Sequence, residues 1–596
     1  MILNLPPIRA GALARQLFCG LLFAWMLCAQ PGAREEPAPA AVGAGIPVND
    51  PLVIAKCASC HTRDSQGNMQ RISWERATPE GWQEALKRMI LSDGVALTPA
   101  EARSIVKYLS ADHGLAPEEA KPIMYDAERR IHQETNIPND QVQHACARCH
   151  TFAQALAWRR SADDWNQLAE MHATRFKLPP NQEAIAFLAK VAPLHTPEWD
   201  AWAGRTRKQG LAGRWLVTAS LRGHGRYYGE MQVEAAGDDE FTTTVRLTSV
   251  NDGSQIVRGG RSVVYAGYAW RGRSKGVQAA SSSPGVAASG IAAPGVAASG
   301  IASPGVAAPD NEFSEAREVL WMTPDQNMAE GRWFWGQYQE FGFDVQLRRA
   351  SDNPASGPAL LMADRSSLKT GTEANRIRLI GDRFPARVTA ADLDFGPGIT
   401  VRRVVSSAAS EVVAEVDVAS DAALGKRDVV LLRSRLPGAL AIYDRVDYIK
   451  VSPDSAMAAF SDQDHAPGYQ KFEAIGYQRG PDGRMHTPDD VELGPLDALS
   501  GLGGVTWSLE VFYSNPGSKT DYVGKIDPSG FFTPSAASPS ANFDVWVVAT
   551  ANALTAQNGK PLAGKSYMVV TVPIYTLNGR RYVRDLDRWV DDGPAQ

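Results

Sequence analysis

The apolar residues near the start of the chain recur with the period of an α-helix. Trp82, Leu86 and Met89 follow one another at intervals of four and three residues, which predicts a helix within residues 78–94. A stripe of the same kind returns farther along the chain, and its members are Trp165, Leu168 and His172. The first third of the chain is therefore expected to be helical.

Two further helices are indicated by their ends and by their apolar content. Thr98 is a good N-cap, Pro99 suits the first helical position, and Glu101 completes a capping box. The helix that starts there is expected to stop near Gly114, and it carries three apolar residues on one side, Ile105, Val106 and Leu109. Residues 182–191 form the last predicted helix of this region.

A polar stretch from about Pro117 to Glu134 is interpreted as a helical connector between two helical units. Its charged residues are Glu118, Glu119, Lys121, Glu128 and Arg129. Charges at this density on a helix are typical of a face in contact with solvent, and we interpret them in that way rather than as a binding site. The two units then cover residues 49–115 and 135–203 of a helical domain that spans 49–203.

From about Gly213 the pattern changes to short stretches of strand-forming residues separated by Gly, Asn and Asp, as expected of antiparallel strands and their turns. The strands expected in residues 204–350 are 215–221, 227–233, 242–247, 262–268, 318–322, 331–338 and 344–348. Residues 351–437 have the size of an immunoglobulin-like sandwich, and residues 438–596 continue the pattern as a C-terminal β domain. The predicted fold is multidomain: one all-α domain followed by three all-β domains of barrel or immunoglobulin-like sandwich type.

A low-complexity stretch, residues 276–309, interrupts the first β domain. The ten residues 283–292 recur almost unchanged as 293–302, with proline and glycine in each copy and no charged or large side chain. Such a segment cannot bury enough surface to offset the entropy lost on ordering. We expect a flexible insertion within a hairpin.

The helical domain contains two copies of the motif Cys-x-x-Cys-His. The first is Cys57-Ala58-Ser59-Cys60-His61 and the second is Cys146-Ala147-Arg148-Cys149-His150. This motif is the attachment signature of c-type haem, in which two thiols form thioethers to one porphyrin and the adjacent histidine is the proximal iron ligand. The motifs therefore predict two covalently bound haems and, for the helical domain, the small all-α cytochrome c fold. A redox dithiol and half of a zinc site are the alternatives for an isolated Cys-x-x-Cys, and the histidine and the repetition argue against both.

The N-terminal segment reads as a secretory signal peptide covering residues 1–33. It has Arg9 and Arg15, then an apolar run at 17–27, then small residues at 29–33. The chain has six cysteines, and the two outside the haem motifs, Cys19 and Cys28, fall in this segment. Residues 34–48, rich in Ala, Pro and Glu, are expected to be a disordered leader. Export to an oxidising periplasm follows, and no later run is apolar enough to cross a membrane.

The second ligand of each haem iron is inferred by aligning the sequences of the two units. Met89 follows Trp82 by seven residues, and His172 follows Trp165 by seven. The expected ligand pairs are His61 with Met89 and His150 with His172. A thioether opposite histidine raises the reduction potential relative to a second imidazole, so the two haems are expected to differ in potential.

Other residues compete for the same positions. Met171 is the main rival for the second haem, and Met69 and Met124 are weaker rivals for the first; Met89 can also be read as an ordinary core methionine. The remaining histidines of the region are taken as surface or connector residues, namely His113, His132 and His195. His144 lies too close to its own proximal motif to reach the opposite face of the haem.

Taken together, the chain resembles the large α subunit of quinohemoprotein amine dehydrogenase over nearly all of its mature length. The stretches that carry the resemblance are CASCH (57–61), TPEGWQEALKRM (78–89), GVALTPAEARSIVKYL (94–109), GLAPEEA (114–120) and CARCH (146–150). The insertion at 276–309 departs from what the family leads us to expect, and it puts only the local loop structure in doubt.

The resemblance implies a periplasmic heterotrimer that oxidises primary amines to aldehydes and ammonia. A small subunit would carry a cysteine tryptophylquinone, a β-propeller subunit would help to enclose it, and this chain would pass electrons through its haems to a soluble cupredoxin or small cytochrome c. No cysteine here is spare for a tryptophylquinone crosslink, and no nucleophile–base set is recognisable in residues 204–596. No catalytic residue is therefore expected on this chain.

Two other functions remain open at this point. One is a free-standing dihaem electron carrier whose β domains dock another dehydrogenase, and the other is a dihaem peroxidase, which needs one haem with an open distal position. A nucleic acid partner is not expected, because the net charge is −5 and the sequence has no basic patch.

Overall fold

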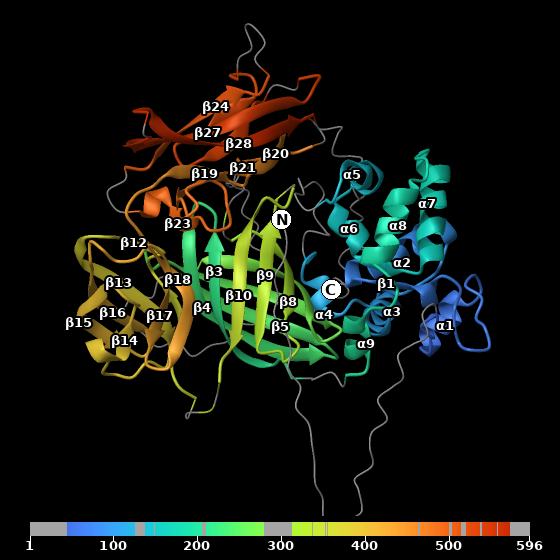
Figure 1. Cartoon of the computed structure of the whole chain (residues 1–596). Coiled ribbons are helices and arrows are strands. Elements are labelled where there is room, and N and C mark those ends of the chain that lie inside the picture. Colours follow the sequence, from blue (N-terminus) through green and yellow to red (C-terminus); the bar gives the residue numbers. More distant parts are fainter. Residues whose placement is uncertain are drawn as a thin grey trace, which may run out of the picture. The chain divides into compact units, whose positions relative to one another are not determined.

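The computed structural model shows a mainly helical N-terminal domain followed by three β domains (Figure 1). It describes residues 44–124, 137–147, 150–205, 210–278, 311, 313–336, 338–351, 353, 356–462, 465–499, 503–513, 520–536, 539–556 and 558–572. The predicted signal peptide and most of the predicted leader lie outside these residues. Among the described helices, none has the length and apolar content needed to span a bilayer.

The N-terminal domain is helical apart from one short ladder. Its helices are α1 (Pro51–Cys57), α2 (Pro79–Asp93), α3 (Pro99–Asp112), α4 (Pro117–Ala120), α5 (Asp140–Cys146), α6 (Phe152–Leu156), α7 (Ala162–Phe176), α8 (Gln182–Val191) and α9 (Pro197–Ala203), with a 3-10 turn at Ile72–Trp74. Strands β1 (Glu75–Ala77) and β2 (Trp158–Arg160) pair antiparallel. The domain is therefore not wholly α as the sequence predicted, because three-residue strands are too short to leave a period-two pattern.

The predicted helix starts and stops are confirmed where side chains cap them. At the start of α3 the Thr98 backbone N–H donates to Glu101 Oε2 at 2.7 Å, and the Glu101 N–H donates to Thr98 Oγ1 at 3.2 Å. The helix ends at Asp112, two residues before the predicted Gly114, and α8 has the predicted bounds. Capping chemistry thus located both ends of α3 from the sequence alone.

The two helical units, which we call unit one (44–124) and unit two (137–203), repeat one arrangement. In unit one the indole N–H of Trp82, on α2, donates to the carbonyl of His113 at the end of α3, at 2.9 Å. In unit two the indole N–H of Trp165, on α7, donates to the carbonyl of Ala192 at the end of α8, at 3.1 Å. The two tryptophans therefore face equivalent positions, as the sequence overlay predicted.

The prediction of a solvated helical connector is wrong in two respects, because residues 121–124 form a turn rather than a helix and Glu119 is buried. Helix α4 ends at Ala120, and the Glu119 side chain is only 6% exposed, buried between the two units. Glu118 is exposed as predicted. Glu128 and Arg129 lie outside the described residues, as does His132.

The first β domain is a closed antiparallel barrel in the order β10-β3-β4-β5-β6-β7-β8-β9. Its strands are β3 (Gly213–Leu221), β4 (Gly225–Gly237), β5 (Glu240–Ser249), β6 (Gln255–Tyr265), β7 (Ala269–Gln278), β8 (Ala316–Met322), β9 (Met328–Trp335) and β10 (Phe341–Arg349). The strand expected at 262–268 ends at Tyr265, because a turn follows there. The insertion predicted at 276–309 starts too early, because residues 276–278 belong to β7 and pair with β6. Strands β7 and β8 are paired neighbours, and residues 279–310 between them lie outside the described residues.

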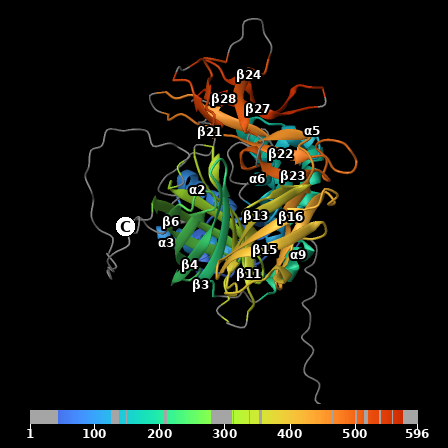
Figure 2. The same ribbon diagram turned by 90° about the vertical axis from the view of Figure 1, so that its left-hand side faces the viewer.

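The second β domain is a sandwich of two four-stranded sheets, β11-β13-β16-β15 and β12-β18-β17-β14. Its strands are β11 (Ala359–Ala363), β12 (Ser367–Lys369), β13 (Thr372–Asp382), β14 (Leu393–Asp394), β15 (Ile399–Ala408), β16 (Glu411–Val418), β17 (Gly425–Leu431) and β18 (Ser434–Tyr443). Figure 2 shows β13, β16 and β15 side by side. Because β18 pairs with β17, this domain extends to Tyr443, beyond the predicted boundary at 437.

The C-terminal β domain contains sheets in the orders β19-β22-β23, β20-β28-β27-β24 and β21-β26-β25. Its strands are β19 (Tyr448–Ser452), β20 (Ser455–Ala459), β21 (Gln470–Lys471), β22 (Glu473–Gln478), β23 (Val491–Pro495), β24 (Val505–Val511), β25 (Gly524–Ile526), β26 (Phe531–Pro534), β27 (Phe543–Thr555) and β28 (Pro561–Thr571). Its buried apolar residues form one cluster, which also includes Ala441 and Tyr443 of β18.

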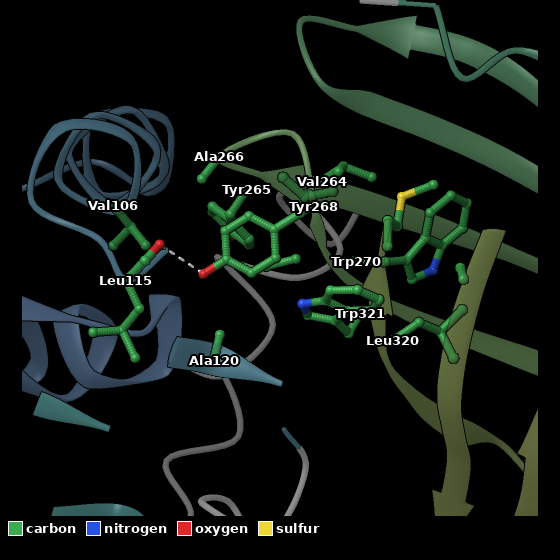
Figure 3. Packing of buried hydrophobic residues seen from close by; sticks show 14 of the residues in the cluster. Val106, Leu115, Ala120, Val264, Tyr265, Ala266, Tyr268, Trp270, Leu320 and Trp321 are labelled. Carbon is green, nitrogen blue, oxygen red and sulfur yellow. Dashed lines mark hydrogen bonds between the residues drawn. The ribbon is translucent and has the colours of Figure 1, made fainter. Parts of the chain in front are cut away.

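Unit one is packed onto the barrel through a continuous apolar cluster (Figure 3). In that view Val106, Leu115 and Ala120 of the helical domain meet Tyr268 and Trp321 of the barrel. The Tyr268 hydroxyl donates to the Leu115 carbonyl at 2.9 Å, and the Trp321 indole donates to the Pro117 carbonyl at 2.7 Å.

A buried ion pair also fastens α2 to the barrel. Glu80, in the first turn of α2, pairs with Arg271 of β7, and both side chains are buried. Burial opposes ionisation of Glu80, but attraction to Arg271 outweighs it and lowers the pKa of the carboxyl to about 2. The equivalent position on α7 is the exposed Asp163, so only the first unit has this anchor.

Candidate functional site

The first motif lies at the end of α1 and in the turn that follows. Asp50 caps the helix by accepting from the Val53 N–H at 2.8 Å. Cys57 is half-buried and Cys60 is exposed. The His61 ring donates from Nδ1 to the Gln70 carbonyl at 3.0 Å. The loop thereby holds the imidazole in one orientation.

The second motif is built in the same way at the end of α5. Asn139 caps that helix by accepting from the Val142 N–H at 2.9 Å, and Cys146 is half-buried. The His150 ring donates from Nδ1 to the Thr151 carbonyl at 2.8 Å. Arg148 and Cys149 lie outside the described residues.

The hydrogen bonds of the two motif histidines decide which ring nitrogen can bind a metal. A carbonyl can only accept, so Nδ1 carries the proton and the lone pair of each neutral ring lies on Nε2. An imidazole whose other nitrogen is tied to the backbone is the usual arrangement for a metal-ligating histidine. His61 and His150 both have it.

The thiols fit covalent attachment better than redox exchange. Burial raises the pKa of the Cys57 thiol, with a further contribution from the nearby Cys60, and burial also raises the pKa of Cys146. Reactive dithiols instead lower the pKa of their nucleophilic cysteine. This observation argues against the redox-dithiol alternative.

Each motif begins against the apolar cluster of its own unit, through Cys57 and Ala58 in unit one and Cys146 and Ala147 in unit two. Other half-buried apolar residues pack against the same two clusters. In unit one they are Leu52, Ile54, Ala85, Ile90 and Leu97. In unit two they are Ile137, Ala155, Leu156, Leu168, Ala169, Phe187 and Ala189. A porphyrin is a flat apolar group, and partly open apolar side chains of this kind can pack against it. The residues of both units therefore fit a haem.

The predicted distal ligands occupy equivalent positions on α2 and α7. Met89 lies eleven residues after the capping Thr78, and His172 lies eleven residues after the capping Ser161. Both side chains are half-buried. The His172 ring donates from Nδ1 to the Leu168 carbonyl at 2.8 Å, which again leaves the lone pair on Nε2.

The rival ligands differ in their surroundings. Met69 has no exposed surface and belongs to the apolar core of unit one, where its N–H donates to Ser73 Oγ at 2.8 Å. Met124 is half-buried against the same core. Met171 is half-buried next to His172. Complete burial in the apolar core indicates a packing role for Met69. Met89, His172, Met124 and Met171 are all half-buried, so burial does not distinguish among them.

A buried charge cluster, Arg76–Glu119–Arg159, lies between the two units. Glu119 Oε2 and Oε1 accept from Arg76 Nη1 and Nη2 at 2.7 and 3.0 Å, and Oε1 also accepts from Arg159 Nε at 3.3 Å. The Arg76 side chain is fully buried, and the Arg159 side chain is 8% exposed. Arg76 and Arg159 are paired residues of β1 and β2, so one carboxylate joins both strands of the ladder.

The ionisation of Glu119 follows from these contacts. Burial opposes its charged form, but the hydrogen bonds and positive charge of Arg76, with Arg159, outweigh burial and lower the pKa to about 2. The carboxylate therefore stays ionised at neutral pH. Sequence reasoning missed this role, although Glu119 lies three residues after Ala116 and four before Ile123 and so shares a face with buried apolar residues.

The prediction that His113 lies at the surface is wrong. Its side chain has no exposed surface, and its ring lies between Trp82 and Tyr108, with centroids 6.3 and 6.0 Å away. His113 ends α3, and its carbonyl accepts the Trp82 indole, so the ring is drawn into the core with the backbone. His195 is half-buried, with Nε2 near the Ala44 carbonyl at 2.7 Å.

The buried His113 predicts a specific loss of stability in acid. Burial, the largest effect, lowers its pKa from 6.5 to about 4 and outweighs the nearby carbonyls, which favour the proton. Between these pH values His113 is protonated in the unfolded chain but neutral in the folded chain. The free energy of unfolding therefore falls as the pH drops from 6.5 to about 4. The full effect is about 3 kcal/mol.

The measurement is denaturant unfolding of the helical domain as a function of pH, with His113→Phe as the comparison. Phenylalanine keeps a ring between Trp82 and Tyr108 but cannot titrate. The variant should lose the slope between pH 6.5 and 4. Glu119, whose folded pKa is depressed to about 2, contributes stability lost only below about pH 4.5, so the two effects occupy separate ranges. An unchanged slope in His113→Phe contradicts the assignment.

Four family models match consecutive parts of the chain. They are described as quinohemoprotein amine dehydrogenase α subunit, haem binding, at residues 48–187; domain II at 208–350; domain III at 359–444; and domain IV at 449–580. The domain II match ends one residue after β10, and the domain III match ends one residue after β18. The matches follow the chain in the order of the family's domains.

Other comparisons add little. No curated protein matches the chain. Among solved structures, a redesigned β barrel, mFAP1, is 12% identical over 23% of this chain and 94% of its own, with a TM-score of 0.16. A SusE-like surface-located polysaccharide-binding protein from Bacteroides thetaiotaomicron is 10% identical over 62% of this chain and 69% of its own, with a TM-score of 0.12. At these TM-scores the likenesses carry no argument.

Proposed function

The chain belongs to the family of quinohemoprotein amine dehydrogenase α subunits, and from that premise we propose that it is the electron-transfer subunit, carrying two covalent c-type haems. It is a haem-binding subunit of an oxidoreductase with further subunits. In the proposal, Cys57 and Cys60 attach one haem, and Cys146 and Cys149 attach the other. His61 and His150 are the proximal ligands.

The observation that carries the proposal is the duplicated arrangement of motif and helix. Each unit has a motif histidine fixed through Nδ1 by a backbone carbonyl, and a motif cysteine packed against the apolar cluster of that unit. Each also has a capped helix of 15 residues with a ligand-type side chain eleven positions after its cap. One haem per unit accounts for all these features together.

The chain's residues set how readily an electron is accepted. When bound, the haem supplies one-electron iron chemistry. The backbone carbonyls that accept from Nδ1 fix each imidazole and raise its basicity toward the metal. The thioether of Met89 favours a higher potential than the imidazole of His172. Electrons are thus expected to be more stable in unit one than in unit two.

The partners and the compartment are part of the same proposal. A small subunit with cysteine tryptophylquinone oxidises primary amines, a β-propeller subunit helps to enclose the quinone, and a cupredoxin or small cytochrome c takes the electrons. Export to the periplasm by the segment 1–33 is supported by its charged start and apolar run. The low-complexity segment 276–309 has no assigned role.

The proposal is tested by purifying the exported chain from its native cells with an affinity tag and staining its partners for quinones. A stoichiometric quinone-bearing small subunit is the expected result. Haem-stained chain without any quinone partner instead supports the free-standing carrier. Two six-coordinate, low-spin haem spectra in both redox states count against the peroxidase.

Replacing the proposed distal ligands gives a direct spectroscopic prediction. His172→Ala should convert one haem to a high-spin form and leave the other unchanged, because only unit two loses its sixth ligand. Met89→Ala should do the same to the other haem. Resonance Raman or magnetic circular dichroism spectra report the spin states.

The rivals supply the controls for that experiment. Met171→Ala and Met69→Ala should leave both haems low-spin. A high-spin haem in Met171→Ala, together with an unchanged spectrum in His172→Ala, contradicts the assignment for unit two. A high-spin haem in Met69→Ala, together with an unchanged spectrum in Met89→Ala, contradicts the assignment for unit one.

A further inference from the structure

A column of aromatic rings and one guanidinium crosses the boundary between the two helical units. Trp82 and Trp158 meet edge to face, with ring centroids 5.6 Å apart. The guanidinium of Arg160 lies 4.5 Å from the centroid of the Trp158 ring and 5.6 Å from that of Trp165. The column therefore connects α2 with α7, the two helices that carry the proposed distal ligands.

Trp158 occupies the middle of this column and belongs to both units. It packs against the buried apolar cluster of unit one and against that of unit two. A Cβ on Gly81 would lie 3.2 Å from the Trp158 ring, so the glycine allows the ring to lie directly against α2. Trp158 is nevertheless only half-buried, as are the apolar residues beside the second motif.

The column is held rigidly. Trp158 is paired with Ala77 across the β1–β2 ladder, and the Thr78 N–H donates to the Ala157 carbonyl at 3.0 Å. Arg160 forms a buried ion pair with Glu75. A side chain fixed on both faces keeps one position, as a group that must provide constant coupling requires.

Given the proposed function, we propose that Trp158 is the residue that couples the two haems electronically. Electron tunnelling weakens less through closely packed atoms than through water or open gaps, and Trp158 fills the space between the two cores with a polarisable ring. In the step it serves, one haem iron is oxidised from Fe(II) to Fe(III) and the other is reduced from Fe(III) to Fe(II). No bond forms or breaks and no proton moves.

A purely structural role makes a different prediction. If Trp158 only fills the junction, its loss should lower the stability of the domain or disturb the haem spectra, and the rate of inter-haem exchange should follow those changes. If it couples the haems, the exchange rate should fall while the spectra and the reduction potentials stay constant. The two readouts therefore separate the roles.

The experiment uses the purified dihaem chain with a flash-generated reductant, without amine or partner subunits. Absorbance follows the redistribution of the electron between the haems. EPR spectra, reduction potentials and thermal unfolding are measured on the same variants. In Trp158→Leu the exchange should slow severalfold with unchanged EPR spectra and potentials. Trp158→Phe should recover most of the rate. Trp507→Leu, which changes a half-buried tryptophan of the C-terminal β domain, should exchange like the wild type.

An exchange rate in Trp158→Leu equal to that of the wild type overturns the proposal, as does slow exchange accompanied by a changed haem spectrum. If Trp158→Leu does not incorporate haem, the experiment uses Trp82→Phe instead. That variant reduces the ring contact between Trp82 and Trp158, and the same slower exchange with unchanged spectra and potentials is expected. Because no amine is used, failure here leaves the amine dehydrogenase function standing. A purified chain that carries fewer than two haems contradicts both the proposed function and the proposed role of Trp158.

Discussion

Replacing Glu119 by glutamine is expected to destabilise the helical domain by about 3–5 kcal/mol, because it leaves two buried guanidinium groups without a counter-charge. Arg76 is fully buried and Arg159 nearly so, and Glu119 is the carboxylate that contacts both. The amide keeps one oxygen acceptor but loses the charge. The effect is large because the desolvation cost of both arginines remains after their partner is gone.

The matched control is Glu118→Gln, one residue away. Glu118 is exposed, and removal of a surface charge usually changes stability by no more than about 0.5 kcal/mol. Denaturant unfolding followed by haem absorbance measures the helical domain separately from the β domains. Equal unfolding midpoints for the Glu118 and Glu119 variants contradict the cluster's proposed role.

Removing the second attachment site is expected to unfold α5, α7 and α8 of unit two, while unit one survives the equivalent change. The buried apolar cluster of unit two has seven residues, Val142, Phe152, Trp165, Ala184, Ile185, Leu188 and Ala192. A core of that size does not offset the entropy of ordering α5, α7 and α8 without a further apolar group. The double variant Cys146→Ala/Cys149→Ala should lose one haem in mass and lose hydrogen-exchange protection across α5, α7 and α8.

The pair Cys57→Ala/Cys60→Ala is the matched control. It should also lose one haem, but α2 and α3 should keep their protection, because their cluster continues into the barrel. The Glu80–Arg271 ion pair and the Tyr268–Leu115 hydrogen bond hold them there. Protection lost equally in both units, or retained in unit two, contradicts this account of the two cores.

The sequence located those features whose physical signal is local. The capping box at Thr98 and the helical stripe through Trp82 and Met89 each depend on residues a few positions apart. The same holds for the short strand-forming stretches of the barrel and the Gly, Asn and Asp turns between them. The overlay of the two tryptophans also rests on short spacings, and the equivalent indole hydrogen bonds of Trp82 and Trp165 confirm it.

The features that sequence reasoning missed depend on contacts between distant segments. Glu119 is charged and lies in a polar stretch, so local composition indicated solvent; its burial is set by Arg76 and Arg159, 43 and 40 residues away. His113 follows a surface-like Ser-Ala-Asp sequence, yet the end of α3 turns inward to accept the Trp82 indole. The β1–β2 ladder has only three residues on each strand and likewise arises from tertiary contacts.

The ligand assignments Met89 and His172 remain predictions of the sequence overlay. The structure adds that both lie eleven residues after the caps of equivalent helices and that the His172 ring is oriented through Leu168. The spin-state experiment decides between them and Met69 and Met171.

The most direct test of the central claim, that this chain conducts electrons from a reaction centre housed on another subunit, is anaerobic addition of a primary alkylamine to the purified chain with and without its quinone-bearing partner. Haem absorbance is recorded in both samples. The account predicts reduction of both haems in the complex and no reduction in the isolated chain. Reduction of the isolated chain by the amine, or the absence of haem iron from it, contradicts the claim.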